Sequence, residues 1–123
     1  KNTADAYRGI GIACWEQKEY KAALKAFKNA VKAGTKENAT LYNLMGGCAL
    51  KLDDGKSALS YYEKGLAASG SSDELKKEME YNVIVSYEKM QNWEKAKSKL
   101  NEYLEKYPDD ETAKKEVEFL ETR

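Results

Sequence analysis

Residues 7–31, YRGIGIACWEQKEYKAALKAFKNAV, are the stretch of sequence that decides the fold. In its second half, four apolar residues share one face of a helix: Ala23, Phe27, Ala30 and Val31. Small residues allow a neighbouring helix to come close, and the large ring of Phe27 fills the space that a glycine or alanine leaves opposite it. The stretch therefore predicts two amphipathic helices that are joined by a short turn.

The same pattern returns twice along the chain. Ala23, Ala58 and Ala96 are separated by 35 and 38 residues. A large apolar residue follows each alanine by four positions, as Phe27, Tyr62 and Leu100. An apolar residue precedes each alanine by thirteen positions, as Ile10, Met45 and Val83. Agreement at fixed offsets indicates an internal repeat, so we predict three helix–turn–helix units at about 4–37, 39–70 and 77–108.

The segments between the units contain signals for helix ends. Gly34 is suited to terminate a helix, and Ser71, three residues before Glu74, predicts a capping box at the start of the third unit. The spacing between Ala58 and Ala96 is three residues longer than that between Ala23 and Ala58, and the extra residues lie around 69–74. They lengthen either this loop or the helix that follows it.

A further amphipathic pattern follows the third unit. Ala113, Val117 and Leu120 share one face, whereas most of the charged residues lie elsewhere. We expect a capping helix at about 110–122 that covers Tyr103 and Leu104 of the third unit. The predicted fold class is all-α, an alpha-alpha superhelix of about seven antiparallel helices.

This succession of residue types resembles the tetratricopeptide repeat (TPR), a helix–turn–helix unit of about 34 residues. The first unit matches best, and the third departs most, because Ile84 and Tyr103 stand where small residues are expected. These bulkier residues suggest looser packing, or packing against something other than a standard repeat. The resemblance implies a single TPR domain over residues 1–123, with a concave groove lined by the first helix of each unit.

Counting by the repeat offset places a set of apolar, aromatic and polar residues in this groove: Arg8, Ile12, Trp15, Asn43, Gly47, Leu50, Tyr81, Val85 and Glu88. Aromatic side chains dominate binding hot spots, so Trp15 and Tyr81 are the expected anchors for a peptide segment. Arg8 and Asn43 are expected to pair with its backbone or with a carboxylate. The alternative is that these side chains only pack against neighbouring helices.

Some members of the resembling family bind the C-terminal carboxylates of heat-shock chaperones through a clamp of two asparagines and several basic residues. Arg8 fits one basic position, but Ile12 and Leu44 stand in place of the asparagines. Glu78 and Asn82 occupy the other two basic positions. A carboxylate where a cation is needed argues against this clamp. The expected ligand is therefore apolar or mixed in character.

Composition excludes several other functions. The 123 residues include 21 Lys and Arg, 21 Asp and Glu, and no His. Balanced charge argues against nucleic-acid binding, and the absence of histidine removes the commonest general base and metal ligand. No apolar run reaches the roughly 20 residues of a membrane-spanning helix. We expect no catalytic residue, cofactor, metal or membrane insertion; nothing indicates a secretory context, which favours the cytoplasm.

The zero net charge is unevenly distributed. Residues 1–37 carry eight positive and four negative charges, whereas residues 73–123 carry ten and fourteen. Five lysines recur every three to four positions along the second predicted helix: Lys18, Lys21, Lys25, Lys28 and Lys32. The plainer interpretation of this stripe is a solvated outer face. The leading predicted function is a protein–protein interaction adaptor or scaffold; the alternative is an assembly module that self-associates weakly or forms part of a larger multidomain protein.

Overall fold

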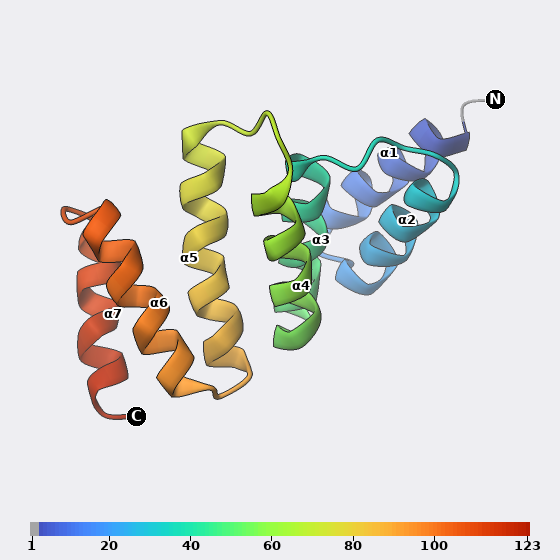
Figure 1. The fold of residues 1–123 in the computed structure, drawn as a ribbon. Coiled ribbons are helices and arrows are strands. Elements are labelled where there is room, and N and C mark those ends of the chain that lie inside the picture. Colours follow the sequence, from blue (N-terminus) through green and yellow to red (C-terminus); the bar gives the residue numbers. More distant parts are fainter. Residues whose placement is uncertain (1–2) are drawn as a thin grey trace.

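The computed structural model describes residues 3–123, and this part of the chain contains helices and no strands, as predicted (Figure 1). The seven helices, in chain order, are α1 (Thr3–Glu16), α2 (Tyr20–Lys32), α3 (Ala39–Lys51), α4 (Gly55–Ala67), α5 (Asp73–Lys89), α6 (Trp93–Lys106) and α7 (Glu111–Glu121). None of the helices in this range has the length and apolar character of a membrane-crossing segment.

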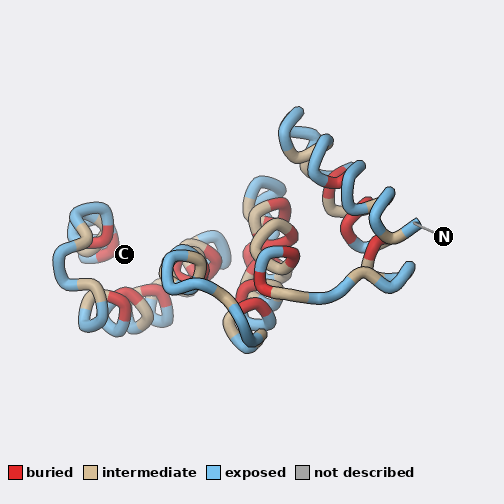
Figure 2. Tube along the Cα trace, turned by 90° about the horizontal axis from the view of Figure 1, so that it is seen from above, coloured by how far each residue is buried: buried red, intermediate tan, exposed pale blue. Residues whose placement is uncertain are grey.

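The helices form a single curved array. Each helix packs against the next in the chain, and α3 also contacts α5. The described chain begins and ends at opposite ends of the array (Figure 1). Seen from above, buried and exposed positions alternate along the helices, because each helix presents an apolar face to its neighbours (Figure 2). The array therefore has the arrangement of a superhelical repeat protein.

Glycines let the two helices of the first and second units come into close contact. A Cβ at Gly11 would lie 2.6 Å from Cε1 of Phe27, and a Cβ at Gly46 would lie 2.6 Å from Cζ of Tyr62. Both rings are buried. The small-and-large alternation in the sequence is therefore a direct contact between α1 and α2, and again between α3 and α4.

The third unit reaches the same burial with different residues. Ile84 stands at the position of the two glycines, and Leu100 at that of the two rings, and both are fully or almost fully buried. A larger residue on α5 is thus matched by a smaller one on α6. Tyr103, the second bulky residue of this unit, is also buried. These residues are as well buried as their counterparts, but α5 and α6 lie close together along less of their length than α1 and α2 or α3 and α4, in agreement with the expected looser packing.

The helix ends agree with one sequence signal and correct another. Gly34 has φ +102° and its N–H donates to the carbonyl of Val31, as expected of a residue that ends a helix. The cap of α5 is Ser72, however, not Ser71. Ser72 directly precedes the first helical residue, so its Oγ accepts the N–H of Leu75 at 3.1 Å. The three extra residues of the third unit lengthen its first helix: α5 has 17 residues, whereas α3 has 13.

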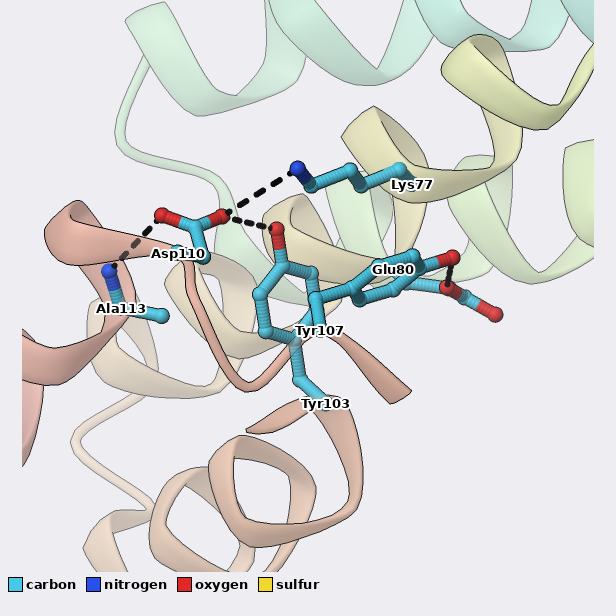
Figure 3. A network of polar contacts seen from close by, with 6 residues as sticks. All are labelled: Lys77, Glu80, Tyr103, Tyr107, Asp110 and Ala113. Atoms are coloured by element: carbon cyan, nitrogen blue, oxygen red, sulfur yellow. Dashed lines mark hydrogen bonds and ion pairs between the residues drawn. The ribbon is translucent and has the colours of Figure 1, made fainter. Parts of the chain in front are cut away.

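A polar network joins α5, α6 and α7 (Figure 3). Asp110 caps the first turn of α7 and accepts the hydroxyl of Tyr103 at 2.5 Å. Lys77 of α5 lies 3.8 Å from the same carboxylate. The hydroxyl of Tyr107 donates to Glu80 at 2.8 Å. The contacts of Asp110 hold α7 against the third unit. Tyr103 is buried at this junction.

Candidate functional site

A groove of about 360 Å³ opens along α1, α3 and α5, a volume typical of ligand pockets. Five of the nine residues that the sequence places in a groove line it: Trp15, Asn43, Gly47, Leu50 and Val85. They come from three different helices, so the stacking of the units is what brings them together. The side chains are mainly apolar, as in most ligand sites.

Trp15 forms the wall that α1 contributes. A Cβ at Gly47 would lie 2.7 Å from Cη2 of the indole, so the ring rests directly on the backbone of α3. The indole also meets the ring of Tyr20 edge to face, with centroids 5.2 Å apart. Trp15 therefore lines the groove and packs between helices at the same time.

Asn43 provides a polar group inside the groove. Its Nδ2 donates to Oε2 of Glu78 at 3.2 Å, which joins α3 to α5. Its Oδ1 is buried and makes no hydrogen bond within residues 3–123. A buried acceptor without a partner is costly and uncommon. The oxygen is thus an unpaired acceptor in the groove wall, which an N–H group entering the groove would reach when the side chains that cover it move aside.

Tyr81 lines an adjoining hollow of about 340 Å³ that reaches Asp110 and Thr112 at the start of α7. Glu78 and Asn82 line both this hollow and the groove, so the two depressions are neighbours. The Tyr81 ring meets Tyr103 edge to face, with centroids 5.5 Å apart. Burial raises the pKa of Tyr81 to about 12, so this phenol stays protonated even at an alkaline pH at which an ordinary tyrosine ionises.

Three of the predicted residues lie elsewhere. Arg8 and Ile12 are exposed on α1 and line neither hollow. Glu88 is half-buried beside Glu116 of α7 and lines neither hollow. Burial, followed by the neighbouring Glu116 carboxyl, raises the pKa of Glu88 to about 8, while the charge of Arg123 opposes this shift. Glu88 therefore belongs to the contact between α5 and the last helix.

Metal-binding groups and the two cysteines are the remaining candidates for chemistry in the described chain. No group of three or more cysteine, aspartate or glutamate side chains is placed to hold a metal ion within residues 3–123. Cys14 and Cys48 are free thiols. Cys48 is fully buried, and this burial raises its pKa to about 11, which suits a packing role.

Comparison with known proteins decides the family. The sequence matches the tetratricopeptide repeat over residues 8–73, more than half of the chain. The chain belongs to the TPR family. No curated protein matches it.

Solved TPR structures share the fold of this chain. The Arabidopsis OM64 TPR domain is 19% identical, with a TM-score of 0.76 over 98% of this chain and 96% of that one. The first TPR of Spaghetti (RPAP3), bound to the HSP90 peptide SRMEEVD, is 16% identical, with a TM-score of 0.76 over 98% and 92%. YrrB, a TPR protein with an unusual peptide-binding site, is 26% identical, with a TM-score of 0.76 over 91% of this chain and 55% of that one. These similarities confirm the TPR superhelix.

Within this TPR groove, the sequence prediction missed two kinds of residue. Tyr62 reaches the groove from α4, although only the first helix of each unit was expected to line it. Leu44 and Asn82 line it as well, although counting by offset assigned them only to the clamp positions. Each directly follows a predicted residue, Asn43 or Tyr81. A tolerance of one position in the repeat offset would have included both.

Proposed function

We propose that this TPR chain is an adaptor that binds a peptide segment of a partner protein in the groove along α1, α3 and α5. The observation that carries the proposal is the buried, unpaired Oδ1 of Asn43 beside apolar walls. A peptide in the groove offers both of the things that this site lacks: N–H groups for the oxygen and side chains for the apolar surface.

The solved relatives support peptide binding as a use of this fold. The first TPR of Spaghetti is bound to an HSP90 peptide, and the second TPR of human RPAP3 is in complex with the HSP70 peptide SGPTIEEVD. TPR folds are generally interaction modules and not enzymes, in keeping with the proposed role.

The chemistry of this groove favours a ligand different from those acidic tails. Glu78 lines the groove, and its carboxylate would repel a ligand carboxylate nearby. Two lysines also line it: Lys89 lies 2.8 Å from Asp53, so its charge is already partly balanced, and the ammonium of Lys51 lies 5.9 Å from the ring centroid of Tyr20. An apolar segment with free backbone N–H groups therefore fits the groove better than a cluster of carboxylates.

A selection experiment tests the proposal. Peptides of about twelve residues, selected from a random phage-displayed library on the wild-type chain, would be measured by calorimetry against two leucine variants. Asn43→Leu removes the unpaired oxygen, and Asn101→Leu makes the same change at an exposed position of α6. We expect binding to weaken about tenfold for Asn43→Leu, the loss of one hydrogen bond, and to be unchanged for Asn101→Leu.

Amide chemical-shift mapping completes this test. The selected peptides should shift the indole resonance of Trp15 and the side-chain amide of Asn43. Peptides that bind Asn43→Leu as tightly as the wild type, and shift only residues outside the groove, would refute the proposal.

A further inference from the structure

A larger hollow, of about 930 Å³, lies on a different surface of the molecule. It is formed by the turn before α2, the first two turns or so of α2, and the end of α3, and it shares no lining residue with the groove. We call it the α2 basic hollow. Four lysines line it: Lys18, Lys21, Lys25 and Lys28. Glu19 is the one acidic residue among the nine that line it.

The hollow also exposes apolar surface. Leu52, which ends α3, is 42% exposed. Leu24 and Tyr20 of α2 are half-buried and line the same space. Positive charges and exposed apolar side chains are therefore found together in one concave surface.

The charges of the hollow are not neutralised by the chain. Ion pairs in the described part of the chain are formed by other lysines: Lys77, Lys89, Lys99, Lys106 and Lys114. None of the four hollow lysines has an acidic group within ion-pair distance in residues 3–123. Their mutual repulsion is thus relieved mainly by solvent and salt, and otherwise by two nearby carboxylates, Glu19 in the hollow and Asp54, whose charge interacts with that of Lys28.

The repeat itself shows that the fold does not require these lysines. In the second unit, 35 residues later, the equivalent positions are Asp53, Lys56, Ser60 and Glu63. In the third unit, 73 residues after the first, they are Gln91, Glu94, Ser98 and Asn101. The α4 and α6 helices fold with only one lysine at these eight positions. The lysines of α2 are therefore an addition to the repeat pattern.

We propose that the α2 basic hollow is a second interaction site, which binds an acidic protein segment that carries a large apolar side chain. Charge complementarity selects the acidic segment, and Leu24 and Leu52 receive the apolar side chain. Lys21 and Lys28 are seven residues apart, roughly 10 Å along α2, and Lys18 extends the row of charges by the turn that precedes the helix. An extended segment of about five residues covers this row. This site is additional to the groove and independent of it.

The apolar surface distinguishes this occupant from other polyanions. A phosphate backbone has no apolar group to bury against Leu52, and a vesicle surface is too flat to follow a concave site. An acidic segment with an aromatic or leucine side chain uses both features of the hollow.

Fluorescence anisotropy with a labelled synthetic peptide, EDELFEDE, tests this inference. The wild-type chain should bind the peptide, and replacing its central Leu-Phe by Ser-Ser should weaken binding. Lys21→Glu with Lys25→Glu should weaken binding about tenfold or more, because charged contacts are replaced by repulsion. Leu52→Ser, at an exposed position, should weaken it several-fold without affecting folding.

A matched control separates the site from general basicity. Lys76→Glu with Lys115→Glu changes the net charge equally at two exposed positions outside the hollow, and it should leave the affinity unchanged. The proposal is overturned if this control weakens binding as much as the hollow variant does, or if the Ser-Ser peptide binds equally well.

Two other occupants are tested in parallel. Anionic phosphatidylserine vesicles or duplex DNA that bind more tightly than the peptide, and lose binding with Lys21→Glu and Lys25→Glu, would overturn the proposal. Sedimentation velocity tests a second copy of the chain as the occupant. A wild type that self-associates, together with a Lys21→Glu, Lys25→Glu variant that is monomeric, would also overturn the proposal, because the hollow would then be filled by a second copy. We expect a monomer, and unchanged binding of groove-selected peptides by the hollow variant.

Discussion

The indole of Trp15 rests on Gly47 so closely that a methyl group at position 47 would stand 2.7 Å from Cη2. This contact joins α1 to α3 and shapes one wall of the groove. The residue expected to anchor a ligand is therefore also a packing residue, and the two interpretations of Trp15 that the sequence left open are compatible.

Gly47→Ala should displace the indole and lower the free energy of unfolding by about 1–3 kcal/mol, the usual cost of overpacking. The Trp15 indole resonance would report the displacement, and urea unfolding the stability. Gly9→Ala is the matched control. A Cβ there meets nothing within 4 Å, so the higher helix propensity of alanine should stabilise α1 by about 0.5–1 kcal/mol. An equal change in the free energy of unfolding for Gly47→Ala and Gly9→Ala would contradict the contact between Trp15 and Gly47.

Gly11→Ala should destabilise the chain by about 1–3 kcal/mol, because the added methyl group meets the ring of Phe27. Phe27→Leu alone should also destabilise it, by leaving a cavity. The double variant should lose less than the two single losses combined, since the smaller side chain makes room for the methyl group. Urea unfolding of the four proteins measures this coupling. Strict additivity would show that α1 and α2 do not interlock through this pair.

Rising pH should loosen the contact between α5 and α7. Burial and the nearby Glu116 raise the pKa of Glu88 to about 8, whereas an unfolded glutamate titrates near about 4.3. Between these values the folded state binds more protons than the unfolded state. The free energy of unfolding contributed by this group therefore falls as pH rises. Thermal unfolding from pH 5 to pH 9 should show this decline in the wild type.

Glu88→Gln provides the control for this pH effect. The amide cannot ionise, so the variant should lose much of the decline and should be the more stable protein at pH 9. Glu118→Gln, at an exposed position of α7, should leave the decline intact. A wild type and a Glu88→Gln variant with parallel pH profiles would rule out Glu88 as the source.

Asp110 should be the most sensitive position for docking of the last helix. Its carboxylate caps α7, accepts the Tyr103 hydroxyl and lies near Lys77. Asp110→Ala should cost about 1–2 kcal/mol for the cap alone and should also leave the Tyr103 hydroxyl unpaired. Asp110→Asn retains a good cap and should cost less. Hydrogen exchange of the α7 amides measures both, and equal protection in the alanine variant and the wild type would disprove this role.

Acidification should weaken the same junction. The hydrogen bond from Tyr103 is the main reason that the pKa of Asp110 is lowered from its ordinary value. An unfolded aspartate titrates at about 3.9. Because the folded-state pKa of Asp110 is lower, this group adds to the free energy of unfolding above the unfolded value, and the contribution is lost as the pH falls through the folded-state pKa. The protection factors of the α7 amides, which correct for the slower intrinsic exchange in acid, should fall at low pH in the wild type, and less so in Asp110→Asn.

Most of the fold was predictable because its determinants are local. The spacing of Ala23, Ala58 and Ala96, with large residues four positions later, specifies helix pairs whose faces must be covered by the next unit. Gly34 ended its helix as predicted, because only the residues adjacent to it matter there. The position of the α5 cap was wrong by one residue, since Ser71 and Ser72 are equally suitable until the first helical residue is known.

The groove was predictable only in part. A repeat offset places residues on a helix face to within about one position, so Leu44 and Asn82 were missed and Arg8 and Ile12 were included. Ile84 shows the same limit in the core: a bulky residue at a glycine position suggests loose packing, and only the structure shows that Ile84 is nevertheless fully buried while α5 and α6 pack less extensively than the other helix pairs.

The sequence by itself determined the period, the helix pairs and the balance of charge, because these depend on residue types at fixed spacings along one helix. Only the tertiary structure decided which side chains meet across helices. It paired Trp15 with Gly47, turned Glu88 towards Glu116, and gathered unpaired lysines around Leu52. Such contacts depend on the angle and depth at which one helix packs on the next, which are set by all the side chains of the interface together.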